Sequence, residues 1–139
     1  LEEFGWRAYL LPHLQSRYPA FKSSLILAVC WALWHAPFFL WRFDFSLFMA
    51  FGFFFSLTLG SLILTSLFNL SKGSIAPVIL FHLMNNLTSA LEREYLVAVT
   101  GAGTVFLAIY LFRTYGREHL SDLPRITDFY PQKTTYETC

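Results

Sequence analysis

The stretch FSLFMAFGFFFSLTLGSLILTSLFNLS, residues 45–71, runs for 27 residues without a single Asp, Glu, Lys or Arg. An α-helix rises about 1.5 Å per residue, so about 20 mostly apolar residues cross the hydrocarbon core of a bilayer. Inside that core the backbone must satisfy its own hydrogen bonds, which favours a helix. The stretch therefore predicts a transmembrane helix.

Three further charge-free runs share this character, and short polar breaks separate all of them. The runs are residues 23–41, 73–91 and 95–112, and the breaks lie near residues 19–23, 42–44, 71–74 and 92–94. The opening segment, residues 2–18, is less apolar and predicts a fifth helix that ends before Pro19. We therefore expect an all-α, polytopic transmembrane bundle of about five helices with no β-sheet, embedded in a lipid bilayer.

Composition favours a membrane protein over a soluble one. Hydrophobic residues make up 55% of the 139 residues and charged residues only 14%, against about 25% in soluble domains. The net charge of +1 indicates no nucleic-acid partner. Cys30 and Cys139 lie far apart and form neither a disulfide framework nor a metal motif.

The last part of the chain differs from these spans. Residues 113–139 hold two prolines and mixed charges, so we expect a membrane core at residues 1–112 and then a solvated, loosely ordered tail. The chain starts without Met, a basic segment or a signal peptide. We expect it to belong to a longer, multi-pass protein of the cell membrane whose upstream spans are missing here.

Ionisable and amide side chains inside the predicted spans are candidates for function, because their burial in lipid is costly. His35 lies in one span, and His82 and Asn86 lie four residues apart on one face of another. Both spans start on the same side of the membrane. Counted from there, His35 lies about 17 Å deep, His82 about 12 Å and Asn86 about 18 Å. We therefore expect the three side chains to share one site.

The opening helix adds two adjacent carboxylates, Glu2 and Glu3, and one cation, Arg7. Glu3 and Arg7 are four residues apart and can form an ion pair, whereas Glu2 points about 100° away. Each feature alone has a common structural explanation: packed histidine, interhelical asparagine, or a helix-stabilising pair. Their combination on three helices favours a shared catalytic site.

These motifs resemble those of a known family, the CPBP intramembrane endopeptidases (CAAX proteases and bacteriocin-processing proteins, also called Abi). EEFGWR, residues 2–7, matches E-E-x-x-x-R, and HLMNN, residues 82–86, matches H-x-x-x-N. WALWH, residues 31–35, resembles F-x-x-x-H, with Trp31 in place of the usual Phe. We interpret Trp31 itself as packing or lipid-facing bulk. The likeness runs from residue 2 to about residue 91.

The resemblance implies proteolysis within the membrane by a glutamate-type mechanism without a metal or other cofactor. It implies four catalytic residues and two supporting charges, which are Glu2, His35, His82 and Asn86, and Glu3 and Arg7. Glu2 would activate a water as general base and His35 would help to position it. His82 and Asn86 would stabilise the oxyanion. The implied substrates are membrane-associated peptides or proteins, such as prenylated CAAX-type, bacteriocin or signal-peptide substrates.

Two alternative functions stay open at this point. A zinc-dependent membrane metalloprotease could use His35, His82 and one Glu as metal ligands. Asn86 argues against zinc, because an amide is a poor zinc ligand and a good oxyanion donor. A non-catalytic immunity or transport module could use the same intramembrane Glu and His in a proton relay.

Overall fold

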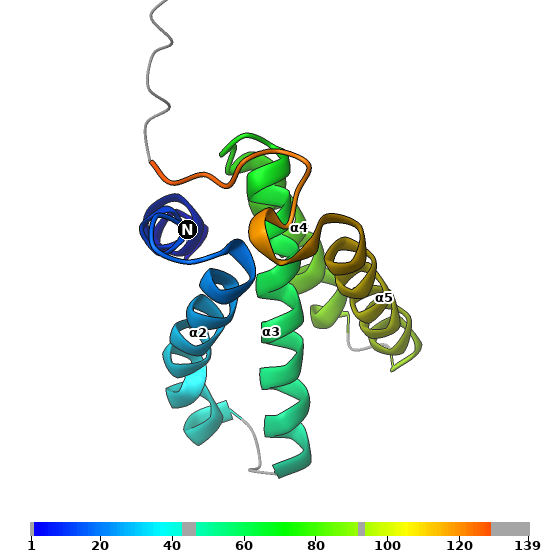
Figure 1. Ribbon diagram of the computed structural model, residues 1–139. Helices are drawn as coiled ribbons and strands as arrows, with labels where there is room; N and C mark the ends of the chain where they lie inside the picture. Colours follow the sequence, from blue (N-terminus) through cyan, green and yellow to red (C-terminus); the bar gives the residue numbers. More distant parts are fainter. Residues whose placement is uncertain (1, 43–46, 92–93, 129–139) are drawn as a thin grey trace, which may run out of the picture.

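The structure is a computed structural model that describes residues 2–42, 47–91 and 94–128 (Figure 1). Its elements are η1 (Phe4–Leu10), α1 (Leu11–Gln15), α2 (Ala20–Arg42), α3 (Leu47–Leu70), α4 (Ala76–Ala90) and α5 (Glu94–His119). Over these residues there is no β-strand, and η1 and α1 together form the opening helix. The predicted all-α bundle of five helices is confirmed.

The opening helix differs from a regular α-helix, because its first turns, Phe4–Leu10, are π-helical. The Leu11 N–H donates to the carbonyl of Trp6, five residues back. Pro12 follows and has no N–H, and its ring would clash with the carbonyl four residues before it. Wider π-type turns before Pro12 relieve that clash. Such turns are rare and frequently occur at functional sites.

Helix α3 lies at the centre of the bundle, where it contacts η1, α2, α4 and α5 (Figure 1). Two groups of buried apolar side chains hold the helices around it. The larger group is Leu11, Leu27, Trp31, Leu64, Phe68 and Val78. The smaller group, between α3 and α5, is Ile63, Ala108 and Leu111. The core thus fixes α2 and α4 on either side of α3, and these helices carry the predicted histidines.

Among the described residues, one segment, Ala50–Leu70 in α3, is long and apolar enough to cross a membrane. Helix α4 has 15 residues, fewer than the roughly 20 that a bilayer requires. Helix α4 begins only at Ala76, because a turn precedes it. In that turn Gly73 has a φ of +83°, which glycine adopts without steric cost. The predicted break at residues 71–74 is confirmed, whereas residues 43–46 and 92–93, at two other breaks, lie outside the described residues.

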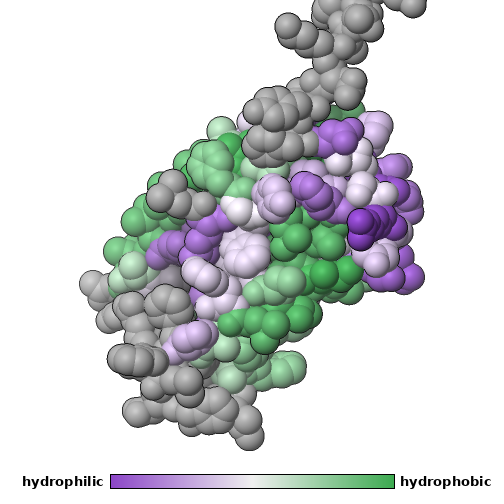
Figure 2. All heavy atoms as spheres, turned by 90° about the vertical axis from the view of Figure 1, so that its left-hand side faces the viewer, coloured by the Kyte–Doolittle hydropathy of each residue, from purple (hydrophilic) through white to green (hydrophobic). Residues whose placement is uncertain are grey.

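Large apolar side chains are nevertheless exposed on the helices outside the core. Leu33, Phe51, Leu80 and Phe106 are all at least half exposed. Figure 2 shows broad hydrophobic areas on one side of the molecule. Such areas are typical of a surface that contacts lipid or further protein.

The segment after residue 112 is more ordered than the sequence predicts. Helix α5 continues to His119, and the chain then crosses the end of the bundle toward the opening helix (Figure 1, orange). There Gln15 Nε2 donates to the Ile126 carbonyl over 2.8 Å, and Arg125 Nε donates to the Gln15 carbonyl over 2.8 Å. A loosely ordered tail is thus wrong for residues 113–128, because these contacts hold it. The division into two domains stays a prediction.

Candidate functional site

The Glu3 carboxylate joins the opening helix to α4. Its Oε1 lies 2.6 Å from His82 Nδ1, and its two oxygens lie 3.2 and 3.0 Å from Arg7 Nη1. Glu3 and Arg7 are both buried, so each charge compensates the other where water is excluded. The expected Glu3–Arg7 ion pair therefore forms, and it extends to a histidine 79 positions further along the chain.

The contact with Glu3 determines which protons His82 can offer. An ionised carboxylate only accepts hydrogen bonds, so Nδ1 of His82 carries a proton. In the neutral ring Nε2 is then an acceptor, and in the imidazolium both nitrogens donate. Glu3 compensates the charge of that imidazolium. The arrangement can thus supply a charged N–H donor from Nε2 when negative charge develops nearby.

The second carboxylate, Glu2, has different surroundings. It is exposed, and its Oε2 accepts a hydrogen bond of 3.2 Å from the indole Nε1–H of Trp31 on α2. The two adjacent carboxylates therefore point to different partners, as their positions on a helix predict. Water can reach Glu2 more easily than it can reach the buried Glu3.

His35 is oriented by its own helix. Its Nδ1 lies 2.8 Å from the Trp31 carbonyl, four residues back. A carbonyl oxygen accepts hydrogen bonds, so Nδ1 carries the proton and Nε2 is an acceptor in the neutral imidazole. The ring packs edge-on against Trp31 and Phe53, at centroid distances of 5.8 and 5.5 Å. His35 is thus oriented by a backbone carbonyl of its own helix and by two aromatic rings.

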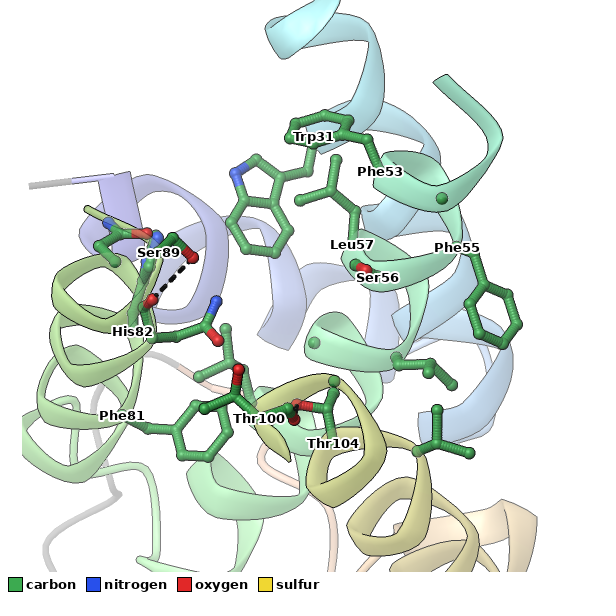
Figure 3. Close-up of a pocket in the computed structure, with 18 of the residues that line it drawn as sticks. Trp31, Phe53, Phe55, Ser56, Leu57, Phe81, His82, Ser89, Thr100 and Thr104 are labelled. Carbon is green, nitrogen blue, oxygen red and sulfur yellow. Dashed lines mark hydrogen bonds between the residues drawn. The ribbon is translucent and has the colours of Figure 1, made fainter. Parts of the chain in front are cut away.

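His35, His82 and Asn86 all line one cavity of about 670 Å³. Its walls come from α2, α3, α4 and α5, and Figure 3 shows Thr100 and Thr104 contributed by α5. A large, mostly apolar cavity with a few polar side chains is the usual form of a ligand site. The three side chains that the depth argument grouped are brought together. Glu2 and Glu3 do not line the cavity. They are hydrogen bonded to two residues that do, Glu2 to Trp31 and Glu3 to His82.

Sequence reasoning missed two parts of this site. Trp31 was interpreted as bulk, but it is buried between His35 and His82. Its position four residues before His35, on the same helix face, was the available signal. The α5 wall, which includes Thr100 and Thr104, carries no motif that would have identified it.

Residues that could hold a metal ion do not converge in the part of the chain that the structure describes. No group of three or more His, Cys, Asp or Glu side chains there is arranged for a metal. We therefore derive no step through a metal ion.

Comparisons with known proteins agree with the motifs. Residues 1–88 match the family model described as type II CAAX prenyl endopeptidase Rce1-like. The chain is 35% identical over 97 residues to "CAAX prenyl protease 2" of Methanococcus maripaludis, a match covering 65% of this chain and 36% of that protein. The chain thus spans about a third of that relative's length. No solved structure gives a significant match. Since the family match covers residues 1–88 of 139 and includes all three motifs, the chain belongs to the Rce1-like type II CAAX prenyl endopeptidases, within the CPBP family.

Proposed function

We propose that this chain carries the active site of an intramembrane endopeptidase acting on membrane-associated, prenylated CAAX-type substrates. The observation that carries the proposal is the cavity that brings together His35, His82 and Asn86, with a carboxylate of the first motif bonded to His82. Membership of a membrane-embedded protease family supports peptide hydrolysis. The name of the Methanococcus maripaludis relative supports a prenylated substrate. We place the whole protein in the cell membrane as a multi-pass protein.

In this proposal Glu2 is the general base that activates the water. A general base needs an accessible lone pair within reach of the water it deprotonates. Both oxygens of Glu3 are buried beside Arg7, whereas Glu2 is exposed and its carboxylate is bonded by the Trp31 N–H. Nε2 of His35, an acceptor in the neutral ring, would hold the same water. Glu3 would act indirectly, by orienting His82 and compensating its charge.

Two side chains of α4 would stabilise the oxyanion. His82 and Asn86 are one turn apart and line the same cavity. The amide of Asn86 and Nε2–H of the His82 imidazolium can donate to one oxygen atom. Donors placed in advance where negative charge develops commonly make the largest single contribution to such reactions.

The steps then balance without a further reactant. Glu2 takes a proton from water as the oxygen attacks the amide carbon, and the carbonyl electrons move to the oxygen held by His82 and Asn86. When the tetrahedral intermediate collapses, the C–N bond breaks and the protonated Glu2 returns a proton to the amine. The second proton of the water passes from the new carboxylic acid to the amine, so the products are a carboxylate and an ammonium group, and Glu2 is ionised again as at the start.

The test uses the full-length protein in detergent or lipid vesicles, with a farnesylated CAAX peptide and the same peptide unfarnesylated. Mass spectrometry should show cleavage of the prenylated peptide, at a rate that a chelator does not change. Absence of cleavage by folded protein would overturn the peptidase proposal. Activity lost with chelator and restored by zinc would overturn the glutamate mechanism and favour a metalloprotease.

A further inference from the structure

Trp31 contacts members of all three motifs. Its side chain is 5% exposed and lies on α2, facing the opening helix and α4. The indole meets the imidazoles of His35 and His82 edge-on, at centroid distances of 5.8 and 5.4 Å. The guanidinium carbon of Arg7 lies 4.6 Å from the ring centroid, in cation–π contact. One side chain thus contacts polar groups of the opening helix, of α2 and of α4.

The indole nitrogen adds a contact that phenylalanine, the usual residue in this motif, cannot make. Nε1–H of Trp31 donates to Glu2 Oε2 over 3.2 Å. Glu2 is exposed, and an exposed Glu side chain ordinarily samples several rotamers. A hydrogen bond from a buried, rigid ring selects the rotamer that directs this carboxylate toward α2. The carbonyl of the same residue orients His35.

We propose that Trp31 is a positioning residue that fixes the direction of the Glu2 carboxylate through its indole N–H. This inference rests on the proposed function, because it concerns the geometry of the base in that reaction. A hydrogen bond to a charged group corresponds to about a 10- to 100-fold effect on a rate when the transition state depends on it. The backbone bond from His35 to the Trp31 carbonyl does not depend on the indole, so the N–H can be tested separately.

The decisive variant is Trp31→Phe in the full-length enzyme, which keeps an aromatic ring and removes the N–H. We expect kcat to fall about 10- to 100-fold, with KM changed less than about twofold. The matched control is Trp34→Phe on the same helix, because Trp34 is 57% exposed and packs edge-on against Trp6 at 6.5 Å. The control should keep wild-type kcat. Thermal unfolding in detergent shows whether either variant is misfolded.

Two further measurements separate a lost hydrogen bond from lost packing. Replacing Trp31 with benzothienylalanine, an isostere with sulfur in place of N–H, should lower kcat as much as Trp31→Phe does. In a ¹H–¹⁵N spectrum, the Trp31 indole signal, assigned by its loss in Trp31→Phe, should shift in Glu2→Gln. Wild-type kcat in the isostere, or an unmoved indole signal, would overturn the inference.

These outcomes are distinct from failure of the proposed function. A folded wild type that cleaves no peptide would overturn the peptidase proposal, and the positioning role with it. An active wild type with unchanged kcat in Trp31→Phe would overturn the positioning role alone. A higher KM at unchanged kcat would also overturn it, because it would show that the ring binds substrate instead.

Discussion

Two buried polar clusters lie on the opening helix, one toward each end, and they differ in how completely they are hydrogen bonded. Toward the start, Glu3 and Arg7 form an ion pair that reaches His82. Toward the end, Gln15 and Asn69 exchange two side-chain hydrogen bonds of 3.0 and 2.8 Å. We call the first the charged cluster and the second the amide cluster.

The side-chain hydrogen bonds of the amide cluster join different parts of the fold. Beyond the mutual pair, Gln15 Nε2 donates to the Ile126 carbonyl, and Asn69 Nδ2 donates to the His119 carbonyl. In the charged cluster, Nε and Nη2 of Arg7 are buried and make no hydrogen bond within the described residues. Buried polar groups without partners are uncommon and need a specific explanation.

The comparison shows that burial alone does not distinguish structural from functional polar groups. The amide cluster is neutral and connects the opening helix, α3 and the segment after α5. The charged cluster keeps unused donors beside a cavity lined by histidines. Buried polar groups without hydrogen-bond partners are expected mainly at functional sites. Substitutions of Glu2 and of the cavity-lining side chains should therefore affect catalysis, and substitutions in the amide cluster should affect stability. Glu3→Gln should also act mainly on stability, because Glu3 belongs to the buried ion pair.

The largest effect is expected for Glu2→Gln. Gln keeps the shape of the side chain and can still accept from the Trp31 N–H, but it cannot take a proton from water. We expect kcat to fall by about 10³–10⁴, the upper part of the range for a general base, with thermal unfolding unchanged. The measurement is peptide cleavage by the full-length protein in detergent. Full activity in Glu2→Gln would transfer the role of base to Glu3.

Glu3→Gln should act mainly on stability. It removes the charge that compensates Arg7 and the acceptor that orients His82, both in a buried setting. Loss of one partner of a buried ion pair costs about 3–5 kcal/mol, so we expect a clear fall in the free energy of unfolding. Arg7→Met with Glu3→Leu, which removes both charges, should recover much of that stability without activity. If Glu3→Gln unfolds like the wild type, the ion pair does not stabilise the fold.

Asn86→Ala should reduce kcat about 10²–10³-fold, because it removes one oxyanion donor. The matched control is Asn85→Ala, the neighbouring asparagine, which also lines the cavity but points about 100° away along α4. We expect the control to change kcat by less than about tenfold. Equal losses in the two variants would show that cavity polarity, and not a placed donor, is what matters.

Parts of this architecture follow from the sequence, because lipid imposes simple constraints. Charge-free runs predict helices, and similar depths in the membrane group His35, His82 and Asn86. The contact between Glu3 and His82 depends on how helices rotate about their axes, and depth says nothing of rotation. The Trp31 N–H, which meets Glu2 from another helix, was missed for the same reason.

The segment after α5 shows a different limit of the sequence. Its prolines and mixed charges predict a loose tail when it is considered alone. Its order depends on the paired amides of Gln15 and Asn69, which lie far away in the sequence and supply partners for its backbone. Local composition cannot reveal partners that only the tertiary fold brings near. The π-helical turns before Pro12 show the same limit to a lesser degree. Pro12 indicates a steric clash in a regular helix, but it does not indicate that the helix widens before it.

The smallest effect on catalysis is expected for Gln15→Ala in the amide cluster. The change removes the two hydrogen bonds between Gln15 and Asn69 and the Gln15 donor to the Ile126 carbonyl, at a cost of about 1–3 kcal/mol in the free energy of unfolding. Because Gln15 contacts none of the catalytic side chains, kcat of the folded enzyme should stay within about twofold of the wild type. Ser16→Ala, an exposed neighbour, should change stability by less than about 0.5 kcal/mol. If Gln15→Ala lowered kcat as far as Asn86→Ala, the two clusters would be coupled through the opening helix, and the segment after α5 would help to hold Glu2 in place.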